Sequence, residues 1–181
     1  MAGDLLLAQD GDLDALTRVV VTSSADIRRF VVWLGVRPDD LDDVLQETFL
    51  KAFRGIGSFR GDSAGLSWLL TIARRVCLDR AATRARVDRL EGEVGRRVVV
   101  TPSQTGAVET ELLIARLPVA FREAFVLVRM WGLSYDEAAE VLDCPRGTVQ
   151  SRVARARHAL ADMVTATSTP EATASVDPLV S

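Results

Sequence analysis

The segment at residues 134–160, SYDEAAEVLDCPRGTVQSRVARARHAL, constrains the fold more than any other part of the chain. Ser134 is followed three residues later by Glu137, a capping-box pattern in which each side chain satisfies a free backbone N–H of the first helical turn. Asp143, Cys144 and Pro145 interrupt that helix, and proline suits the first position of a new helix because its fixed φ is helical. The segment therefore predicts two helices joined by a sharp turn.

The second of these helices has an apolar face and a polar face. Its apolar residues recur at spacings of 4, 3 and 4, the period of one helical face: Val149, Val153, Ala156 and Leu160. Acidic residues precede the turn, whereas arginines follow it. A short helix, a tight turn and a second helix that exposes cations and hydroxyls are typical of a helix-turn-helix that reads DNA.

The chain as a whole is not basic, which limits how it could contact DNA. Its 181 residues carry a formal net charge of −3. Because phosphate binding depends on local cations, any DNA contact must come from patches of arginine. The length allows one domain or two small ones, and a hydrophobic fraction of 48% is enough for packed cores.

Several functional classes have little support in the composition. Two cysteines far apart, Cys77 and Cys144, predict no disulfide framework and fit a reducing, cytoplasmic setting. No apolar run reaches the roughly 18 residues of a membrane span, and the N-terminus has no basic secretory signal. His158 is the only histidine, and metal-ligand spacing is absent, so we expect no metal, no cofactor and no acid–base catalysis.

The first part of the chain also shows helical periodicity. Residues 4–34 predict two helices, with a cap at Ser23 or Ser24 between them and a stop at Gly35. The first is expected to bury Leu13, Leu16 and Val20. Pro38 then opens an acidic helix that extends to residue 53, because negative charge is favoured in the first turns of a helix.

A long helix is expected at residues 63–86, and its second half is rich in arginine. Its expected buried residues are Leu66, Leu69, Leu70, Ala73, Val76 and Cys77. Glycines and a proline in residues 87–106 indicate a flexible linker. Helical periodicity returns in residues 107–163, with Phe121, Ala124, Phe125 and Val128 expected inside, and the polar residues 164–181 predict a disordered tail. The predicted fold is all-α, with two small helical domains at residues 4–86 and 107–163.

Ordered sequence blocks carry a resemblance that covers about residues 5–163. The blocks are DDLDDVLQETFLKAF at 39–53, SFRG at 58–61, WLLTIAR at 68–74, LP at 117–118, GLSYDEAAEVL at 132–142 and GTVQSRVARAR at 147–157. Because it carries these blocks in this order, the chain resembles small bacterial sigma factors of the extracytoplasmic-function group. The resemblance implies that sigma domains 2 and 4 bind core RNA polymerase, direct it to promoter DNA and leave catalysis to the polymerase, so the chain is expected not to be an enzyme.

The resemblance also implies three sites. The acidic helix is similar to the surface that docks on the clamp helices of the polymerase β′ subunit, through Leu41, Asp42, Asp43, Gln46, Glu47, Leu50 and Lys51. The basic helix and the loop before it would recognise and melt the −10 element with cations and stacking aromatics, namely Phe59, Arg60, Trp68, Arg74, Arg75, Asp79, Arg80 and Arg84. The helix-turn-helix would read the −35 element with Arg146, Thr148, Val149, Ser151, Arg152 and Arg155.

The sequence departs from the family pattern at four positions. Arg75 stands where the family usually has Asn, which leaves the preferred −10 base open. Asp143 and Cys144 replace the usual glycine and branched apolar residue in the turn, and aspartate can adopt the left-handed backbone that the turn requires. Gln150 stands where a cation is common, which is expected to weaken phosphate binding slightly.

Two alternatives remain open at this point. One is a helix-turn-helix regulator whose first lobe dimerises or senses a ligand, and the other is a protein-interaction adaptor, which the basic run at 74–86 disfavours. For a sigma factor, we expect a monomer when free, with an anti-sigma protein as a candidate partner. The acidic net charge further suggests that the lobes pack together and mask both DNA faces until polymerase separates them.

Overall fold

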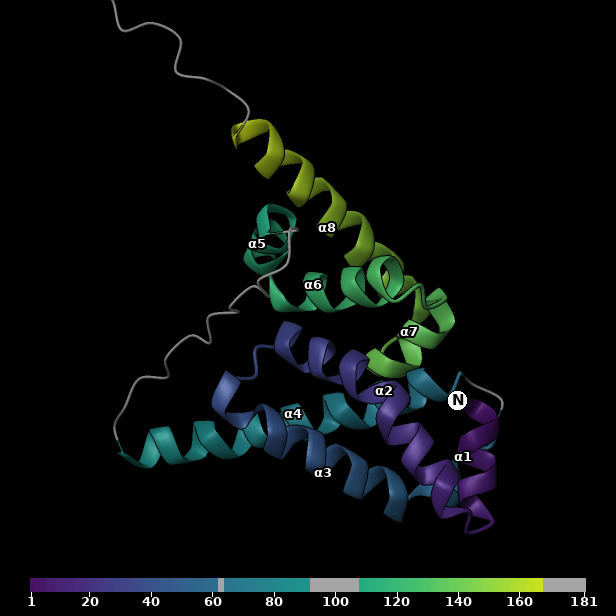
Figure 1. The fold of residues 1–181 in the computed structure, drawn as a ribbon. Helices are drawn as coiled ribbons and strands as arrows, with labels where there is room; N and C mark the ends of the chain where they lie inside the picture. The colour runs from purple at the N-terminus through teal and green to yellow at the C-terminus, as the bar shows by residue number, and fades with distance from the viewer. Residues whose placement is uncertain (62–63, 92–107, 168–181) are drawn as a thin grey trace, which may run out of the picture.

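The computed structural model describes residues 1–61, 64–91 and 108–167, and every regular element in these ranges is a helix (Figure 1). In chain order they are α1 (Ala2–Gln9), α2 (Leu13–Trp33), η1 (Pro38–Asp40), α3 (Leu41–Arg54), η2 (Ile56–Ser58), α4 (Gly65–Glu91), α5 (Val108–Arg116), α6 (Val119–Phe125), η3 (Val126–Met130), α7 (Tyr135–Leu142) and α8 (Arg146–Thr167). Elements α1 to α4 form a first lobe and α5 to α8 a second. A search of the described residues finds no helix long and apolar enough to cross a membrane.

Helix α2 is one uninterrupted helix, capped at its start by the Asp12 side chain, which accepts a hydrogen bond from the Ala15 N–H at 2.9 Å. The expected cap at Ser23 or Ser24 is wrong. Both serines lie inside the helix and donate their hydroxyls to carbonyls four residues earlier, Ser23 to Val19 and Ser24 to Val20. Gly35 ends the segment at φ +90°, as expected.

The buried face of α2 differs from the expected one. Leu13 is 73% exposed, and the buried positions of the first half are Ala15, Val19 and Ser23. Because α2 is a single helix, its first half must stay in phase with the buried Ile27 and the residues after it. The buried face of the first half therefore lies about 100° around the helix, or one residue, from the predicted face.

Helix α4 buries the residues that the sequence predicted. Leu69, Leu70, Ala73 and Val76 are 0% exposed, and Cys77 packs against this core at partial exposure. The helix extends to residue 91, so residues 87–91 of the expected linker are helical. The remainder of that expected linker, residues 92–106, lies outside the described residues.

Helix α6 continues through the π-helical turn η3 and ends at Gly132, whose φ is +68°. The predicted inner face is only partly correct. Ala124 is fully buried, but Phe121 and Phe125 are half-buried, whereas Arg122 and Glu123 are each only 6% exposed. Periodicity missed these two charged residues because their partners lie on other elements.

The helix-turn-helix forms as the sequence predicts. Glu137 N–H donates to Ser134 Oγ at 3.2 Å, and Glu137 Oε2 accepts from Ser134 N–H at 2.8 Å, which completes the capping box. Asp143 ends α7 in the left-handed conformation, at φ 50° and ψ 53°. Helix α8 then begins after Pro145, whose carbonyl accepts from Thr148 N–H at 2.8 Å. It extends to residue 167, past the expected end at 163, and residues 168–181 lie outside the described part.

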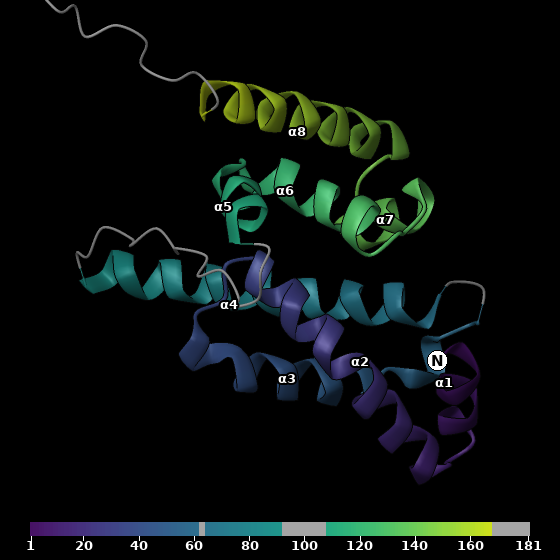
Figure 2. The same cartoon turned by 45° about the horizontal axis from the view of Figure 1, so that its top comes forward.

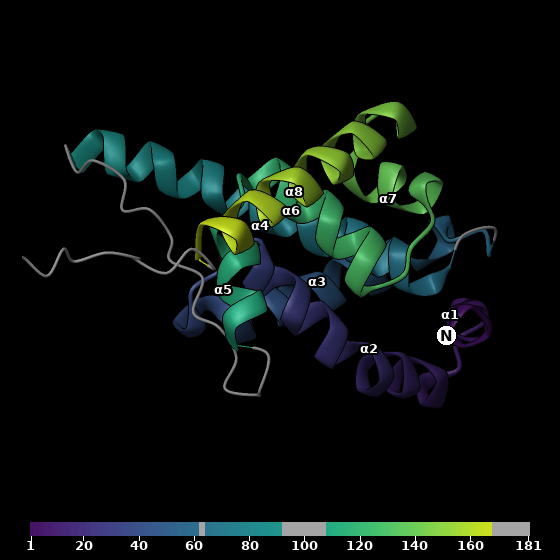
Figure 3. The ribbon, with the colours of Figure 1, turned by 90° about the horizontal axis from the view of Figure 1, so that it is seen from above.

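The two lobes pack together through α2 and α4 on one side and α6 and α7 on the other. Figures 1 and 2 show α6 and α7 lying over the first lobe, with α8 on the far side of α6. The view from above shows α6 and α8 crossing over α2 and α4 (Figure 3). Buried residues of both lobes belong to one hydrophobic cluster, which extends from Leu5 to Val153.

Asp143 provides a test of the turn. Asp143→Gly should keep or raise the free energy of unfolding, because glycine adopts positive φ without strain. Asp143→Val should lower it by about 1–3 kcal/mol, since a β-branched residue is strained there. Chemical denaturation followed by circular dichroism measures both. Equal stability of the two variants would contradict the assigned backbone conformation.

Candidate polymerase and nucleic-acid surfaces

The outer side of α3 carries a stripe of exposed polar residues with one exposed leucine. Asp42, Asp43 and Gln46 are exposed, and Leu50 is 47% exposed. Arg28 of α2 forms an ion pair with Asp42 at 2.6 Å. Leu41, at the start of the helix, is half-buried and packs against the core. The outer stripe, defined as Asp42, Asp43, Gln46 and Leu50, is therefore an accessible acidic surface with an apolar residue at its C-terminal end.

Two other residues predicted for the polymerase surface face a different way. Glu47 accepts from Arg80 Nε at 2.8 Å and from Lys51 Nζ at 3.1 Å, and Lys51 also contacts Asp79 Oδ2 at 3.1 Å. Burial disfavours the ionised Glu47, but hydrogen bonds from Arg80 and Lys51 outweigh it, so the pKa of Glu47 lies below its usual value. The structure thus divides the predicted polymerase surface into the outer stripe and an α3 flank, Glu47 and Lys51, that is turned toward α4.

A second carboxylate ties the basic second half of α4 to the rest of the first lobe. Asp40 accepts from Arg84 Nη2 at 3.0 Å and from Arg37 Nε at 3.1 Å. The hydrogen bond from Arg84, with that from Arg37, keeps the pKa of Asp40 below its usual value despite partial burial. Arg84 is therefore held against the lobe, although it remains 49% exposed.

The predicted −10 cations of α4 point in different directions. Arg74 forms an ion pair with Glu123 of α6 at 3.3 Å, with side chains 16% and 7% exposed. Arg75, one residue later, is exposed. Arg74 is thus enclosed between the lobes, whereas Arg75 is accessible to a ligand.

The predicted stacking aromatics are only partly available. Phe59, which the sequence predicts as a stacking surface for bases, is 3% exposed and belongs to the core, so it is not accessible to a base in this arrangement. It packs against Trp68 at a centroid distance of 5.4 Å and 55° between the rings. Trp68 is half-buried, and Arg60 is exposed in the loop that follows η2.

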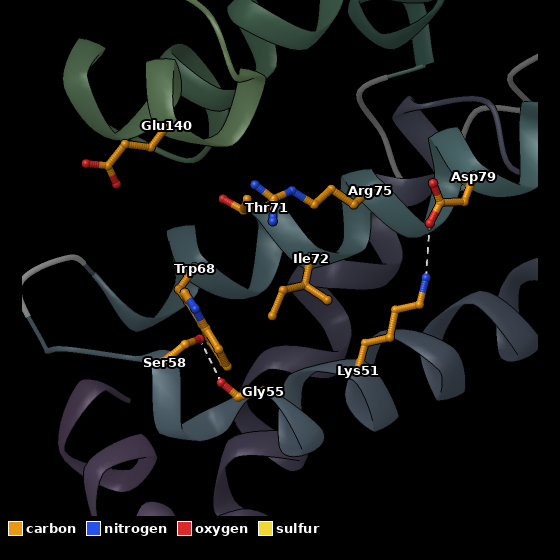
Figure 4. A pocket seen from close by; sticks show the side chains of 9 residues that line it. All are labelled: Lys51, Gly55, Ser58, Trp68, Thr71, Ile72, Arg75, Asp79 and Glu140. Atoms are coloured by element: carbon orange, nitrogen blue, oxygen red, sulfur yellow. Dashed lines mark hydrogen bonds and ion pairs between the residues drawn. The ribbon is translucent and has the colours of Figure 1, made fainter.

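A cavity of about 620 Å³ lies between α3, the η2 turn and α4. Its lining includes Lys51, Ser58, Trp68, Ile72, Arg75 and Asp79 from the first lobe. Glu140 of α7 lies at its edge on the side of the second lobe (Figure 4). The cavity therefore combines an aromatic and apolar wall with two cations and two carboxylates, and the second lobe borders it on one side.

The recognition face of α8 is formed by four of the predicted −35 residues: Thr148, Ser151, Arg152 and Arg155. Ser151 and Arg155 are exposed, and Thr148 and Arg152 are half-buried. Arg152 donates to Cys144 Sγ at 3.7 Å, and the Arg155 guanidinium lies 6.0 Å from the Phe121 ring centroid. These contacts with Cys144 and Phe121 hold the guanidinium groups of the two arginines in place.

Two other predicted −35 residues lie elsewhere. Val149, which the sequence predicts among the −35 contacts, is 0% exposed and packs in the core, so it is not accessible to base edges in this arrangement. Arg146 pairs with Asp136 of α7 at 3.1 Å. It lies at the start of the helix, where phosphates also bind favourably.

Aromatic packing joins the lobes at a seam that the sequence did not reveal. Trp131 packs edge-on against Phe30 at 6.1 Å, and the Arg29 guanidinium lies 5.3 Å from the Trp131 ring. Trp33 of α2 packs into the second lobe against Ile114, Leu117, Val126 and Ala156. Local sequence carries no signal for these contacts, because each partner lies on a different helix.

The seam masks one nucleic-acid face rather than both. Arg74 and the cavity are covered by α6 and α7. Helix α8 lies on the far side of α6 from the first lobe (Figures 1 and 2), and Ser151 and Arg155 of its predicted recognition face are exposed. The expectation that lobe packing masks the second lobe's DNA face is therefore wrong.

Cys77 is not set up as a reactive thiol. Burial raises the pKa of the Cys77 thiol to about 12, which keeps it protonated and unreactive near neutral pH. Within residues 1–61, 64–91 and 108–167, no group of three His, Cys, Asp or Glu residues could hold a metal ion.

Comparisons with known proteins agree with this arrangement. A family model described as Sigma-70 region 2 matches residues 20–87, and one described as Sigma-70, region 4 matches residues 107–160. The chain is 38% identical over 160 residues to "ECF RNA polymerase sigma factor SigC" of Mycobacterium tuberculosis, covering 86% of each chain. It is 36% identical over 172 residues to "ECF RNA polymerase sigma-E factor" of Escherichia coli, covering 86% of this chain and 90% of that relative.

Two solved structures have a similar fold. One is the sigma factor RpoE in complex with the anti-sigma factor NepR from Bartonella quintana, at 29% identity and a TM-score of 0.71, covering 82% of this chain and 96% of that one. The other is CnrH in complex with the cytosolic domain of CnrY, at 27% identity and a TM-score of 0.67, covering 93% and 100%.

Proposed function

Since the chain belongs to the extracytoplasmic-function group of RNA polymerase sigma factors and acts in promoter-specific transcription initiation, we propose that three of its surfaces divide this work. The observation that carries the proposal is an exposed acidic stripe on α3 and an exposed recognition face on α8 within one chain. The polymerase supplies the catalysis, so the chain is a transcription initiation factor and not an enzyme. It acts in the cytoplasm, where the polymerase is.

The outer stripe of α3 binds core polymerase, through the clamp helices of the β′ subunit. Asp42, Asp43 and Gln46 offer carboxylates and an amide to basic and polar partner groups, which favours rapid and specific association. Leu50 supplies an apolar anchor beside them, at the C-terminal end of the stripe. Because this stripe is exposed while the lobes are packed together, docking on it does not require the lobes to part.

The α4 side of the first lobe binds the −10 element as a single strand. Arg75 and Trp68 line the cavity, where Trp68 would support a base. Arg80 and Arg84 lie on the side of α4 that faces α3 and η1 and offer further cations to the backbone. Unpaired strands are bound by cations along the backbone together with aromatic surfaces for the bases. Arg74 becomes available when Glu123 moves away with the second lobe.

The second lobe binds the −35 element through α8. Ser151, Arg152 and Arg155 face a major groove, with Thr148 near the helix start. Arg146, at the N-terminus of the same helix, holds phosphate. The buried Val149 supports this face from beneath rather than contacting bases.

A protein partner is proposed for the free chain. RpoE and CnrH, the two structural relatives, were solved with NepR and with the cytosolic domain of CnrY. An anti-sigma protein could hold the lobes of this chain in a state that excludes polymerase. Without such a partner we expect a monomer.

In vitro transcription with purified core polymerase and a random promoter library tests the function. The expected result is a set of transcripts that start at common positions and depend on the added chain. A regulator that works without polymerase would instead bind duplex DNA alone and give no such transcripts. An adaptor would give neither, so either result would contradict the proposed function.

Asp43→Arg tests the polymerase surface. Reversing one charge in the outer stripe should weaken core binding about tenfold or more, since like charges across an interface are costly. Fluorescence anisotropy of labelled protein titrated with core polymerase measures it, with Asp14→Arg on the exposed start of α2 as the matched control. An unchanged affinity of the Asp43 variant, with normal helicity by circular dichroism, would remove α3 from the interface.

Arg155→Gln tests the recognition helix. Loss of one charged hydrogen bond should weaken binding of holoenzyme to a recovered promoter about tenfold, and the salt dependence should become less steep. Arg157→Gln is the control, because Arg157 is exposed on α8 outside the recognition face. Equal losses in the two variants would show that charge alone, and not position, determines the effect.

A further inference from the structure

Helix α1 lies outside the part of the chain that the family models match. The region 2 model begins at residue 20, whereas α1 ends at Gln9, so the match assigns no role to this helix. Helix α1 nevertheless contacts η2 and the start of α4. It therefore packs against the segment at residues 55–61, here called the η2 loop, which carries the exposed Arg60.

The side-chain amide of Gln9 is bonded to the backbone of the η2 loop. Its Nε2 donates to the Ile56 carbonyl and to the Phe59 carbonyl, each at 2.6 Å. A glutamine amide nitrogen has two N–H groups, so one side chain uses both donors on a single turn of backbone. The second of these carbonyls immediately precedes Arg60.

Two apolar contacts from α1 hold the chain on the other side of Arg60. A Cβ at Gly61, where φ is +75°, would lie 3.4 Å from Leu6 Cδ1. A Cβ at Gly65 would lie 2.8 Å from Cδ1 of the fully buried Leu5, so glycine allows α1 to approach the start of α4 this closely. Helix α1 thus restrains the backbone both before and after Arg60.

The η2 loop needs this restraint because of its composition. Three of its seven residues are glycine, and glycine loses more conformational freedom on ordering than any other residue. The burial of Phe59 fixes one point of the loop, but Arg60 is exposed. Binding through an exposed side chain is weakened by the cost of ordering it and its backbone, and a backbone that is already fixed lowers that cost.

We infer that Gln9 is a positioning residue for promoter recognition, whose amide fixes the η2 loop so that Arg60 faces the unpaired strand. Gln9 acts through Arg60 and makes no contact with DNA of its own. This inference rests on the proposed function, because it takes Arg60 to contact the −10 element. It adds α1, which belongs to none of the three proposed surfaces. A purely structural Gln9 would stabilise the lobe and leave the contribution of Arg60 unchanged.

A double-mutant cycle in full-length holoenzyme tests the inference, on a recovered promoter with a preformed mismatch bubble over the −10 region. Gln9→Met keeps the length of the side chain and removes both donors, and Arg60→Gln removes the cation. We expect Arg60→Gln to weaken bubble binding about tenfold and Gln9→Met about fivefold, the cost of ordering the loop on binding. The double variant should bind within about twofold of Arg60→Gln, whereas independent residues would give a loss of about fiftyfold.

Thr48→Val is the matched control. Thr48 is buried in α3 and donates to the Val44 carbonyl at 2.7 Å, so this variant also loses a side-chain hydrogen bond to a carbonyl of the first lobe, away from the η2 loop. It should leave bubble binding within about twofold of wild type. Hydrogen exchange of the Phe59 N–H, which donates to Ile56 at 3.0 Å, should become faster in Gln9→Met and stay unchanged in the control.

A conservative variant keeps the test independent of how well Gln9→Met folds. Gln9→Lys can still donate to both carbonyls, so Arg60→Gln should again cost about tenfold in that background. Core affinity should stay within about twofold of wild type for every variant.

The inference is overturned if the Gln9 and Arg60 effects multiply, if Gln9→Met binds the bubble like the control, or if Gln9→Met weakens core binding. Wild-type holoenzyme that binds promoters while Arg60→Gln binds them equally well would overturn the inference and leave the proposed function standing. Failure of wild-type holoenzyme to bind any promoter would overturn both.

Discussion

The packing of Trp131 against Phe30 is the contact on which the arrangement of the two lobes depends. Trp131 lies where α6 and its π-helical extension end, and it meets the first lobe edge-on at 6.1 Å, with Arg29 over its ring. An aromatic pair of this geometry contributes about 0.5–1.5 kcal/mol beyond the area that it buries. Nearby, Arg74 and Glu123 are mostly buried and satisfy each other, so separation of the lobes would expose both charges to water or to new partners.

Because of this seam, two of the proposed binding surfaces are exposed and the third is partly covered. The outer stripe of α3 and the recognition face of α8 are accessible while the lobes are packed. Glu140 borders the cavity on the α4 side, and Arg74 is held by Glu123. Under the proposed function, such a chain docks on polymerase and reaches −35 DNA before the second lobe uncovers the −10 site.

The sequence predicted the parts of this structure that depend on local chemistry. The Ser134–Glu137 capping box, the left-handed Asp143 and the buried face of α4 follow from spacing and backbone preference, and the structure confirms them. The cap at Ser23 or Ser24 was wrong because serine hydroxyls can also bond within a helix. Apolar spacing predicts that a helix has a buried face. It does not establish which of two neighbouring sets of residues forms that face, because the rest of the helix determines it.

The parts that the sequence could not predict depend on contacts between distant residues. From the sequence, Glu123 is expected to be an exposed helix residue. The structure pairs it with Arg74, which lies 49 positions earlier in the chain. From the sequence, Phe59 is expected to be a loop aromatic suited to stacking, but the core of the first lobe encloses it. Glu47 and Lys51 lie among the outer-stripe residues in sequence, and only their ion pairs with Arg80 and Asp79 separate them from that surface.

The central claim is that this packed arrangement opens when the chain binds polymerase. The most direct measurement is the distance between two fluorescent labels, one at the exposed Ala81 on α4 and one at the exposed Arg129 on η3 of the second lobe, introduced as unnatural amino acids in the full chain. The account predicts high energy transfer in the free chain and a marked loss of transfer when core polymerase is added. Unchanged transfer in a holoenzyme that forms open complexes would contradict it, because the −10 strand would then bind while α7 still covers the cavity.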